Sequence, residues 1–234
     1  MHLWWGSGSA PCWKPMLVLA EKGLWEGLPN TKIEFSKKEH KQGDVLKYNP
    51  RGQVPTFKDG DLVVNESGAI CMYLEEKYSK DSNKLLPADV NKRAEVYQRM
   101  FESPNLQTNV TEKLVYYRWM NKEEDWDKKY LEEHTEKAKE ELSRWNTILG
   151  DNDYLCGKEF TMADVFVYPV LAFLIRSGAK LPNQPALMQY YKRGYTRPFV
   201  QPRGHPLERR GGSLSLAIYK LLKRRKFYGN KLQI

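Results

Sequence analysis

The sequence has no uninterrupted apolar run approaching the ~20 residues that a helix needs to cross a membrane. Its first residues, MHLWWGSGSAPCWK, also lack the charged start and the apolar block of a secretory signal peptide. Hydrophobic residues nevertheless make up 41% of the 234-residue chain, which is enough for a packed core. The sequence therefore predicts a globular, cytoplasmic protein.

Cysteine is scarce. The chain has three cysteines, Cys12, Cys71 and Cys156, which are odd in number and far apart. This spacing predicts neither a disulfide framework nor a metal-binding knuckle, so we expect reduced thiols and no metal site.

Acidic residues are almost missing from the C-terminal end. From Lys192 onwards there are 12 Lys or Arg and one acid, a net charge of +11, whereas the first 191 residues carry 26 basic and 28 acidic residues. Residues 201–234 are therefore expected to be a basic, divergent tail without stable structure, although 214–226 could form a basic amphipathic helix. Binding to nucleic acid or to an anionic membrane is expected only through this tail.

The first 79 residues alternate short apolar runs with helical patterns, an order typical of a small mixed sheet with helices. Pro15 would remove a backbone hydrogen bond from the first helix, so we expect a kink or a late start there. The expected elements are strands at 3–5 and 32–35, a hairpin through the apolar runs at Thr56 and Val63, and helices at 11–22 and 67–78.

The pattern changes after residues 80–89, which are predicted to be a linker. Residues 90–200 are predicted to be all helical, with helices from 90 to about 120, 128–149 and 161–176. Thr161 and Asp164 form a capping-box variant at the start of the third of these helices, and a role in helix initiation accounts for them.

The most informative segment is NPRGQVPTFKDGDLVVNES, Asn49 to Ser67. The Asp-Gly pair between two apolar runs predicts a hairpin, and the polar residues that end the segment predict a helix start. Val54 precedes a proline and is therefore extended, with backbone groups available to a bound peptide. Because free N–H groups at a helix start attract anions, the segment can hold a small peptide carboxylate.

This segment resembles the glutathione-binding half of the cytosolic glutathione transferases, and the resemblance extends over roughly residues 2–200. It is most similar to the theta-like rho class of fish and molluscs, through the strings WGSGSAPCWK, EHK, NPRGQVPTF, YLEEKY and FTMADVFVYP in that order. The resemblance implies an α/β thioredoxin-like N-terminal domain (1–79) followed by an all-α substrate-binding domain (90–200). It also implies a homodimer that uses glutathione as co-substrate and needs no other cofactor.

Two serines compete for the role of thiolate donor. Ser9 stands at the expected start of the first helix, where it could be a plain N-cap, and it matches the position of the family's activating serine. Ser7 is its rival. In thioredoxin-like redox proteins a C-x-x-C pair occupies this helix start, but here its first position is Ser9, so Cys12 is more simply read as a packing residue.

The resemblance also implies which residues hold glutathione. Glu66 would bind the ammonium group of the γ-glutamyl end, and Ser67 with the helix start would bind its carboxylate. The backbone of Val54 would pair with the cysteinyl part, with Val54-Pro55 expected to be cis. The remaining matches are Gln53 towards the γ-glutamyl end and His40 with Lys41 towards the glycyl end; by pattern alone, the His-Lys pair reads as solvated surface.

The long helical pattern after the linker carries an apolar stripe that is either core or the wall of a pocket for hydrophobic electrophiles. Its members are Phe101, Leu106, Val110, Tyr116 and Tyr117. Thr196 replaces an aspartate that is usual in the family, and the sequence after it has no family match, so a more open pocket is expected.

These observations predict a transferase that conjugates glutathione to hydrophobic electrophiles in detoxification. Two alternatives stay open at this point: a glutathione-dependent redox enzyme that uses Cys12, and a non-catalytic member that binds glutathione or another ligand.

Overall fold

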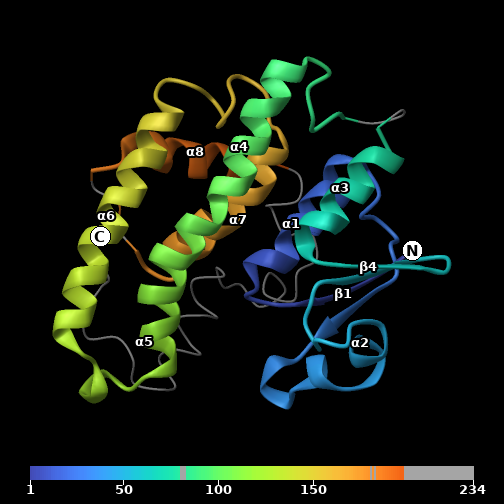
Figure 1. The fold of residues 1–234 in the computed structure, drawn as a ribbon, viewed down its shortest axis with the longest axis horizontal. Helices are drawn as coiled ribbons and strands as arrows, with labels where there is room; N and C mark the ends of the chain where they lie inside the picture. The colour runs from blue at the N-terminus through green and yellow to red at the C-terminus, as the bar shows by residue number, and fades with distance from the viewer. Residues whose placement is uncertain (80–82, 180, 182, 198–234) are drawn as a thin grey trace. The chain divides into compact units, whose positions relative to one another are not determined.

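The computed structural model describes residues 1–79, 83–179, 181 and 183–197. They form two compact units, Met1–Pro87 and a second unit that starts at Ala88 (Figure 1). The expected tail, 201–234, lies outside the described residues, as does part of the expected linker.

The first unit contains a four-stranded mixed sheet in the order β2-β1-β3-β4. Strand β1 pairs in parallel with β2 and antiparallel with β3, and the hairpin partner β4 closes the other edge. The hairpin is confirmed: Asp59 pairs with Leu62, and Gly60 takes a left-handed φ of 58° between them. The strands are β1 His2–Gly6, β2 Asn30–Ile33, β3 Thr56–Asp59 and β4 Leu62–Asn65.

Strand β2 is shifted relative to the sequence prediction of 32–35. It ends at Ile33, because Phe35 already begins a short 3-10 turn, η1, at Phe35–Lys37. A second 3-10 turn, η2 at Glu39–Lys41, follows and leads into helix α2, Gly43–Tyr48.

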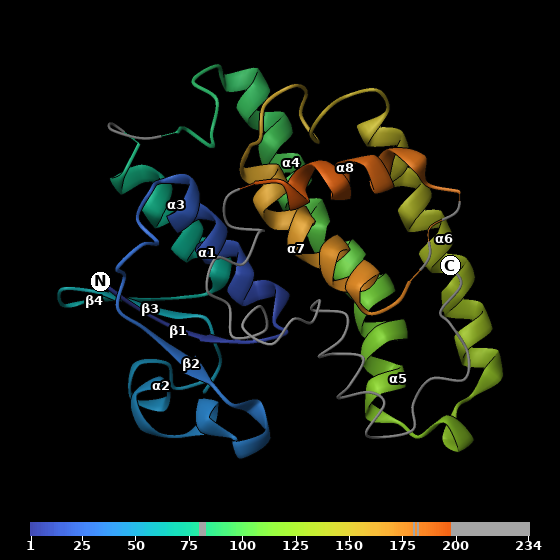
Figure 2. The ribbon, with the colours of Figure 1, turned by 180° about the vertical axis from the view of Figure 1, so that it is seen from behind.

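The two faces of the sheet are covered differently. Helices α1, Ala10–Glu21, and α3, Ser67–Lys77, lie side by side on one face, and α2 lies on the opposite side (Figures 1 and 2). Side chains alternate between the two faces along a strand, so Leu3 and its neighbour Trp4 point to opposite faces. Leu3 is fully buried, and Trp4 packs with Ile33 of β2 and Val45 of α2.

Of the two outcomes expected at Pro15, a kink or a late start of the first helix, the late start is wrong. Helix α1 begins at Ala10, because the Ser9 side chain caps it by accepting the N–H of Cys12 at 3.4 Å. Pro15 lies inside the helix and lacks only the N–H that would have bonded to the carbonyl of Pro11.

The second unit is built from helices, and α4 and α7 pack along each other (Figure 2). The long helix expected from 90 to about 120 is present as one continuous run, but ten residues in its middle form a π-helix, which the sequence pattern does not reveal. The run comprises α4 Val90–Leu106, the π segment Gln107–Tyr116 and α5 Tyr117–Met120; α6 is Lys128–Leu149, α7 Met162–Arg176 and α8 Pro185–Tyr195. None of the described helices is long and apolar enough to span a membrane.

The capping box at the start of α7 is confirmed. Fully buried Asp164 accepts the backbone N–H of Thr161 at 2.8 Å and that of Leu155 at 3.1 Å. Burial raises the pKa of the Asp164 carboxyl to about 6.

Helix α8 was missed from the sequence because its cap is tertiary. Asn146 of α6 accepts the N–H groups of Ala186 and Leu187 through its Oδ1, at 3.0 and 3.3 Å. The cap comes from forty residues away, so the only local start signal is Pro185 at the first position of the helix.

Candidate functional site

The strand register brings one end of each of the four strands to the same end of the sheet. Gly6 at the end of β1 pairs with Ile33 at the end of β2, and Thr56 at the start of β3 pairs with both Trp4 and Asn65. The segments that follow or precede these ends carry every glutathione-site residue expected from the sequence. These residues therefore lie at the same end of the first unit, although the outermost two, Ser9 and Ser67, are 58 positions apart in the sequence.

Ser9 lies between β1 and α1. It is half-buried, and as the N-cap its oxygen accepts the Cys12 N–H. The hydroxyl proton is not used by this cap and is left to donate. Ser7 is exposed and lies in the turn before the helix. The plain N-cap role and a donor role are thus compatible at Ser9.

Cys12 is a buried thiol rather than an exposed nucleophile. Its side chain is 1% exposed, and its sulfur accepts the N–H of Gly6 at 3.4 Å. Burial raises the pKa of the Cys12 thiol to about 11, so it stays neutral at pH 7. No three His, Cys, Asp or Glu among the described residues gather where they could hold a metal ion.

The peptide bond between Val54 and Pro55 is cis, as expected. Val54 is half-buried against the cluster formed by Trp4, Ile33 and Val45. The carbonyl oxygen of the preceding residue, Gln53, accepts hydrogen bonds from the side chains of Asn49 and Thr56, at 2.9 and 3.0 Å (the Asn49 Nδ2 and the Thr56 Oγ1).

Glu66 and Ser67 stand at the junction of β4 and α3. Glu66 has a left-handed φ of 70°, and its exposed carboxylate lies 3.4 Å from a guanidinium nitrogen of Arg51. Ser67 is the first residue of α3, and the side chain of the N-cap residue, Glu66, makes no capping hydrogen bond. The first N–H groups of α3 and its positive dipole end are consequently available to an anion.

His40 and Lys41 approach the same end of the sheet from η2. The Lys41 ammonium donates to the carbonyl oxygen of Arg51 at 2.8 Å, which joins η2 to the loop before Val54. The His40 ring packs edge-on to Phe35 with centroids 5.3 Å apart. Its Nδ1 is buried and has no hydrogen-bond partner among the described residues.

The five residues expected to line a hydrophobic pocket do not share one wall. Phe101 is 78% exposed, whereas Leu106 and Val110 are fully buried in the core. A spacing of five residues turns a helix side chain by about 140°, so Phe101 and Leu106 face different ways. Tyr116 packs against Phe173 with ring centroids 5.7 Å apart, and half-buried Tyr117 stacks on Tyr130 at 4.5 Å.

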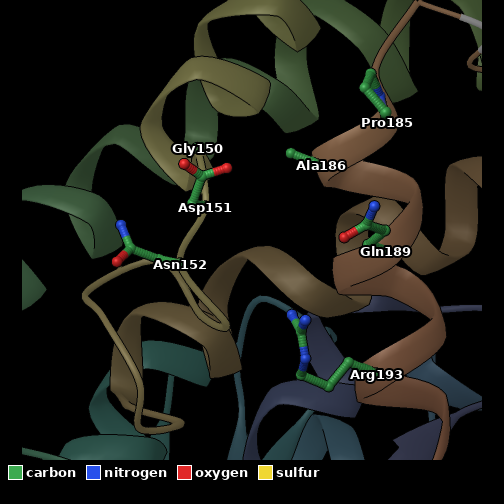
Figure 3. Close-up of a pocket in the computed structure, with 7 residues that line it drawn as sticks. All are labelled: Gly150, Asp151, Asn152, Pro185, Ala186, Gln189 and Arg193. Carbon is green, nitrogen blue, oxygen red and sulfur yellow. The ribbon is translucent and has the colours of Figure 1, made fainter.

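A hollow of about 220 Å³ lies elsewhere in the second unit, between the end of α6 and α8 (Figure 3). Its lining is mainly polar, and Arg193, which points towards it, is already paired with Asp153 at 3.0 Å. None of the residues expected to bind glutathione or an electrophile borders it. The lining residues are Gly150, Asp151, Asn152, Pro185, Ala186, Gln189 and Arg193.

Comparison with known protein families gives two matches. Residues 1–76 match the family described as "Glutathione S-transferase, N-terminal domain", and residues 108–198 match "Glutathione S-transferase, C-terminal domain".

Individual proteins agree with these matches. Glutathione S-transferase A of Pleuronectes platessa is 39% identical over 203 residues, covering 86% of this chain and 89% of that protein. The crystal structure of a glutathione S-transferase from the Antarctic clam Laternula elliptica is 50% identical, with a TM-score of 0.77 over 85% of this chain and 89% of that one. An epsilon-class glutathione S-transferase from Musca domestica, 24% identical with a TM-score of 0.77, shares the fold.

Proposed function

Because this chain belongs to the glutathione S-transferase family, we propose that it activates the glutathione thiol for nucleophilic attack on hydrophobic electrophiles. The observation that supports this proposal is the register of the sheet, in which the strand ends next to Ser9, Val54 and the Glu66–Ser67 junction lie at the same end of the sheet. Detoxification is the physiological role that such a reaction would serve.

Binding rests on charge complementarity with the two ends of the peptide. The Glu66 carboxylate attracts the ammonium group of the γ-glutamyl end, and the uncapped start of α3 with Ser67 receives its carboxylate. The backbone of Val54 pairs with the cysteinyl part. Gln53 contacts the γ-glutamyl end, and Lys41 with His40 provides positive charge and a ring nitrogen for the glycyl carboxylate.

Activation rests on Ser9. A free thiol has a pKa of about 8.5, and lowering it by ~2 units requires ~2.7 kcal/mol of preferential stabilisation of the thiolate. A hydrogen bond to a charged group contributes ~1.5–3 kcal/mol, and the start of α1 adds its dipole. The Ser9 hydroxyl donates to the thiolate and forms no covalent bond with the substrate.

The acceptor site is proposed to use the aromatic residues of the second unit. Tyr116 and Tyr117 are half-buried and present ring surface to an apolar electrophile, while Leu106 and Val110 support the helix from the core. The rho class, a homodimer, a cytoplasmic location and the domain bounds 1–79 and 90–200 belong to the same proposal.

The redox alternative has little support in the structure. Cys12 is buried and its pKa is raised, both of which oppose a role as attacking thiolate. A mixed disulfide trapped at Cys12 would be needed to revive it.

A conjugation assay with glutathione and a chromogenic aryl halide tests the proposal. Ser9→Ala is expected to lower the rate by ~10²-fold or more, the loss typical of one electrostatic donor worth ~3 kcal/mol. Affinity for glutathione should stay within a few fold, because Glu66, Ser67 and Val54 remain. Ser7→Ala is the matched control; a crippled Ser7→Ala beside a mild Ser9→Ala would assign the donor to Ser7. No conjugation by the unmodified protein, with glutathione still bound, would favour the non-catalytic alternative.

A further inference from the structure

Asn49 holds the loop that leads to Val54. It follows α2 directly and is only 5% exposed. Its Oδ1 accepts the N–H of Arg51 at 3.1 Å, and its Nδ2 donates to the carbonyl oxygen of Gln53 at 2.9 Å. Its own carbonyl accepts the N–H of Gly52 at 2.7 Å. One buried residue thus bonds to three consecutive loop residues immediately before the cis peptide bond.

The loop in turn supports the cationic side of the proposed site. Gly52 has a left-handed φ of 57°, and a Cβ there would lie 2.8 Å from the Lys41 Cδ and 2.9 Å from the carbonyl oxygen of His40. The Lys41 ammonium donates to the Arg51 carbonyl. The position of Lys41 therefore depends on the loop conformation that Asn49 maintains.

A second asparagine ties the same segment to the other half of the proposed site. Asn65, the residue before Glu66, donates from its Nδ2 to the carbonyl oxygen of Tyr48 at 3.0 Å. Tyr48 is the residue before Asn49. The hydrogen bond from Asn65 therefore holds the start of the loop, and those of Asn49 hold the residues that follow. The two side chains link the Val54 side of the site to the Glu66–Ser67 side.

We propose that Asn49 is a positioning residue for glutathione binding, acting through the backbone of residues 51–54 and through Lys41 rather than by touching the substrate. The inference rests on the proposed function. When the loop is already ordered, binding of the peptide costs less conformational entropy. Loss of this order should therefore reduce the affinity for glutathione. The thiol-activating Ser9 lies on a different segment and is not held by Asn49.

The test compares Asn49→Ala, Asn49→Asp and the unmodified protein in steady-state kinetics and in calorimetric titration with glutathione. Asn49→Ala is expected to raise the KM and the Kd for glutathione about tenfold or more, which corresponds to about 1.4 kcal/mol of binding free energy. At saturating glutathione kcat should stay within about threefold, because the proposed donor, Ser9, is intact. The KM for the aryl halide should not change.

Asn49→Asp covers the case in which Asn49→Ala does not fold. It has nearly the same shape and keeps the acceptor for Arg51, but it replaces the donor to Gln53 by a carboxylate oxygen that repels the Gln53 carbonyl. It should also raise the Kd for glutathione, and the amide hydrogen of Gly52 should exchange faster in both variants.

Asn146→Ala is the matched control, since Asn146 also makes two hydrogen bonds to backbone N–H groups, but at the start of α8. It should lower the thermal midpoint without altering the Kd for glutathione. If Asn49→Ala and Asn49→Asp bind glutathione as tightly as the unmodified protein, or if they lose kcat instead of affinity, the positioning role is refuted. Failure of the unmodified protein to bind glutathione would refute the proposed function itself. Ser67→Ala separates the two cases, because it should weaken binding even if Asn49 plays no part.

Discussion

The buried ion pair between Lys22 and Glu75 is expected to hold α1, α3 and the chain after α3 together within the first unit. The Lys22 ammonium lies 2.5 Å from one Glu75 carboxylate oxygen, and the two side chains are 0% and 3% exposed. The ammonium also donates to the carbonyl of Asn83 at 2.6 Å. The other Glu75 oxygen accepts the N–H groups of Leu85 and Leu86, at 2.9 and 3.2 Å.

Removing one partner of such a pair leaves an uncompensated buried charge. Glu75→Gln keeps an acceptor but faces the ammonium with a neutral amide, so it should lower the free energy of unfolding by ~3–5 kcal/mol. Lys22→Met should cost nearer ~3 kcal/mol, because the carboxylate keeps its two backbone donors. The double variant Lys22→Met/Glu75→Gln carries neither charge, and it should recover ~1–3 kcal/mol relative to the sum of the single changes.

Equilibrium urea unfolding of the four proteins, followed by fluorescence and circular dichroism, measures these differences. Lys137→Met is a suitable control, since its pair with Glu133 is more than half exposed and should contribute less than ~1 kcal/mol. A loss below ~1 kcal/mol for Glu75→Gln, or single effects that add within ~0.5 kcal/mol, would refute the reasoning.

Three further outcomes are expected. Glu66→Ala or Ser67→Ala should raise the KM for glutathione at least about tenfold, the equivalent of 1.4 kcal/mol, and unchanged affinity in both would remove the binding assignment. The raised pKa of Asp164 means that the folded state holds its proton more tightly, so stability should fall as the pH rises from 3.8 to about 6 and then level off. Asp164→Asn should flatten that part of the curve in pH-dependent thermal unfolding; an unchanged curve would mean that another group titrates there. Deleting residues 201–234 should leave the thermal midpoint nearly unchanged and abolish any salt-sensitive retention on a cation exchanger, whereas an unfolded product would make the tail a structural element.

Much of the first unit could be predicted because its signals are local. The Asp-Gly signal marks a hairpin whose two turn residues are Gly60 and Asp61, and the polar residues before Ser67 mark a helix start. The same holds for α6, whose bounds match the prediction, and for the capping box at Thr161 and Asp164. Each of these features depends on residues within a few positions of one another, so the chain displays it without the fold.

Residue roles were less accessible from pattern alone. Ser9, Glu66 and Lys41 entered the argument through a family resemblance, because a serine or a charged pair on a polar segment has many ordinary explanations. The stripe from Phe101 to Tyr117 shows the limit of periodicity. Its members are apolar, but whether each faces the core, a neighbour or solvent depends on the turn of the helix and on the π segment inside it.

The sequence by itself therefore determined the hairpin, most of the strands and helices and, through the family resemblance, the cis bond before Pro55. Only the tertiary structure decided which distant residues meet. The pairing of Thr56 with both Trp4 and Asn65 brings the segments of the proposed site to the same end of the sheet, and the burial of Cys12 opposes a role as attacking thiolate. Hydrogen bonds such as those of Asn49 also depend on a completed fold, because burial and partner geometry exist only once separate segments have packed together.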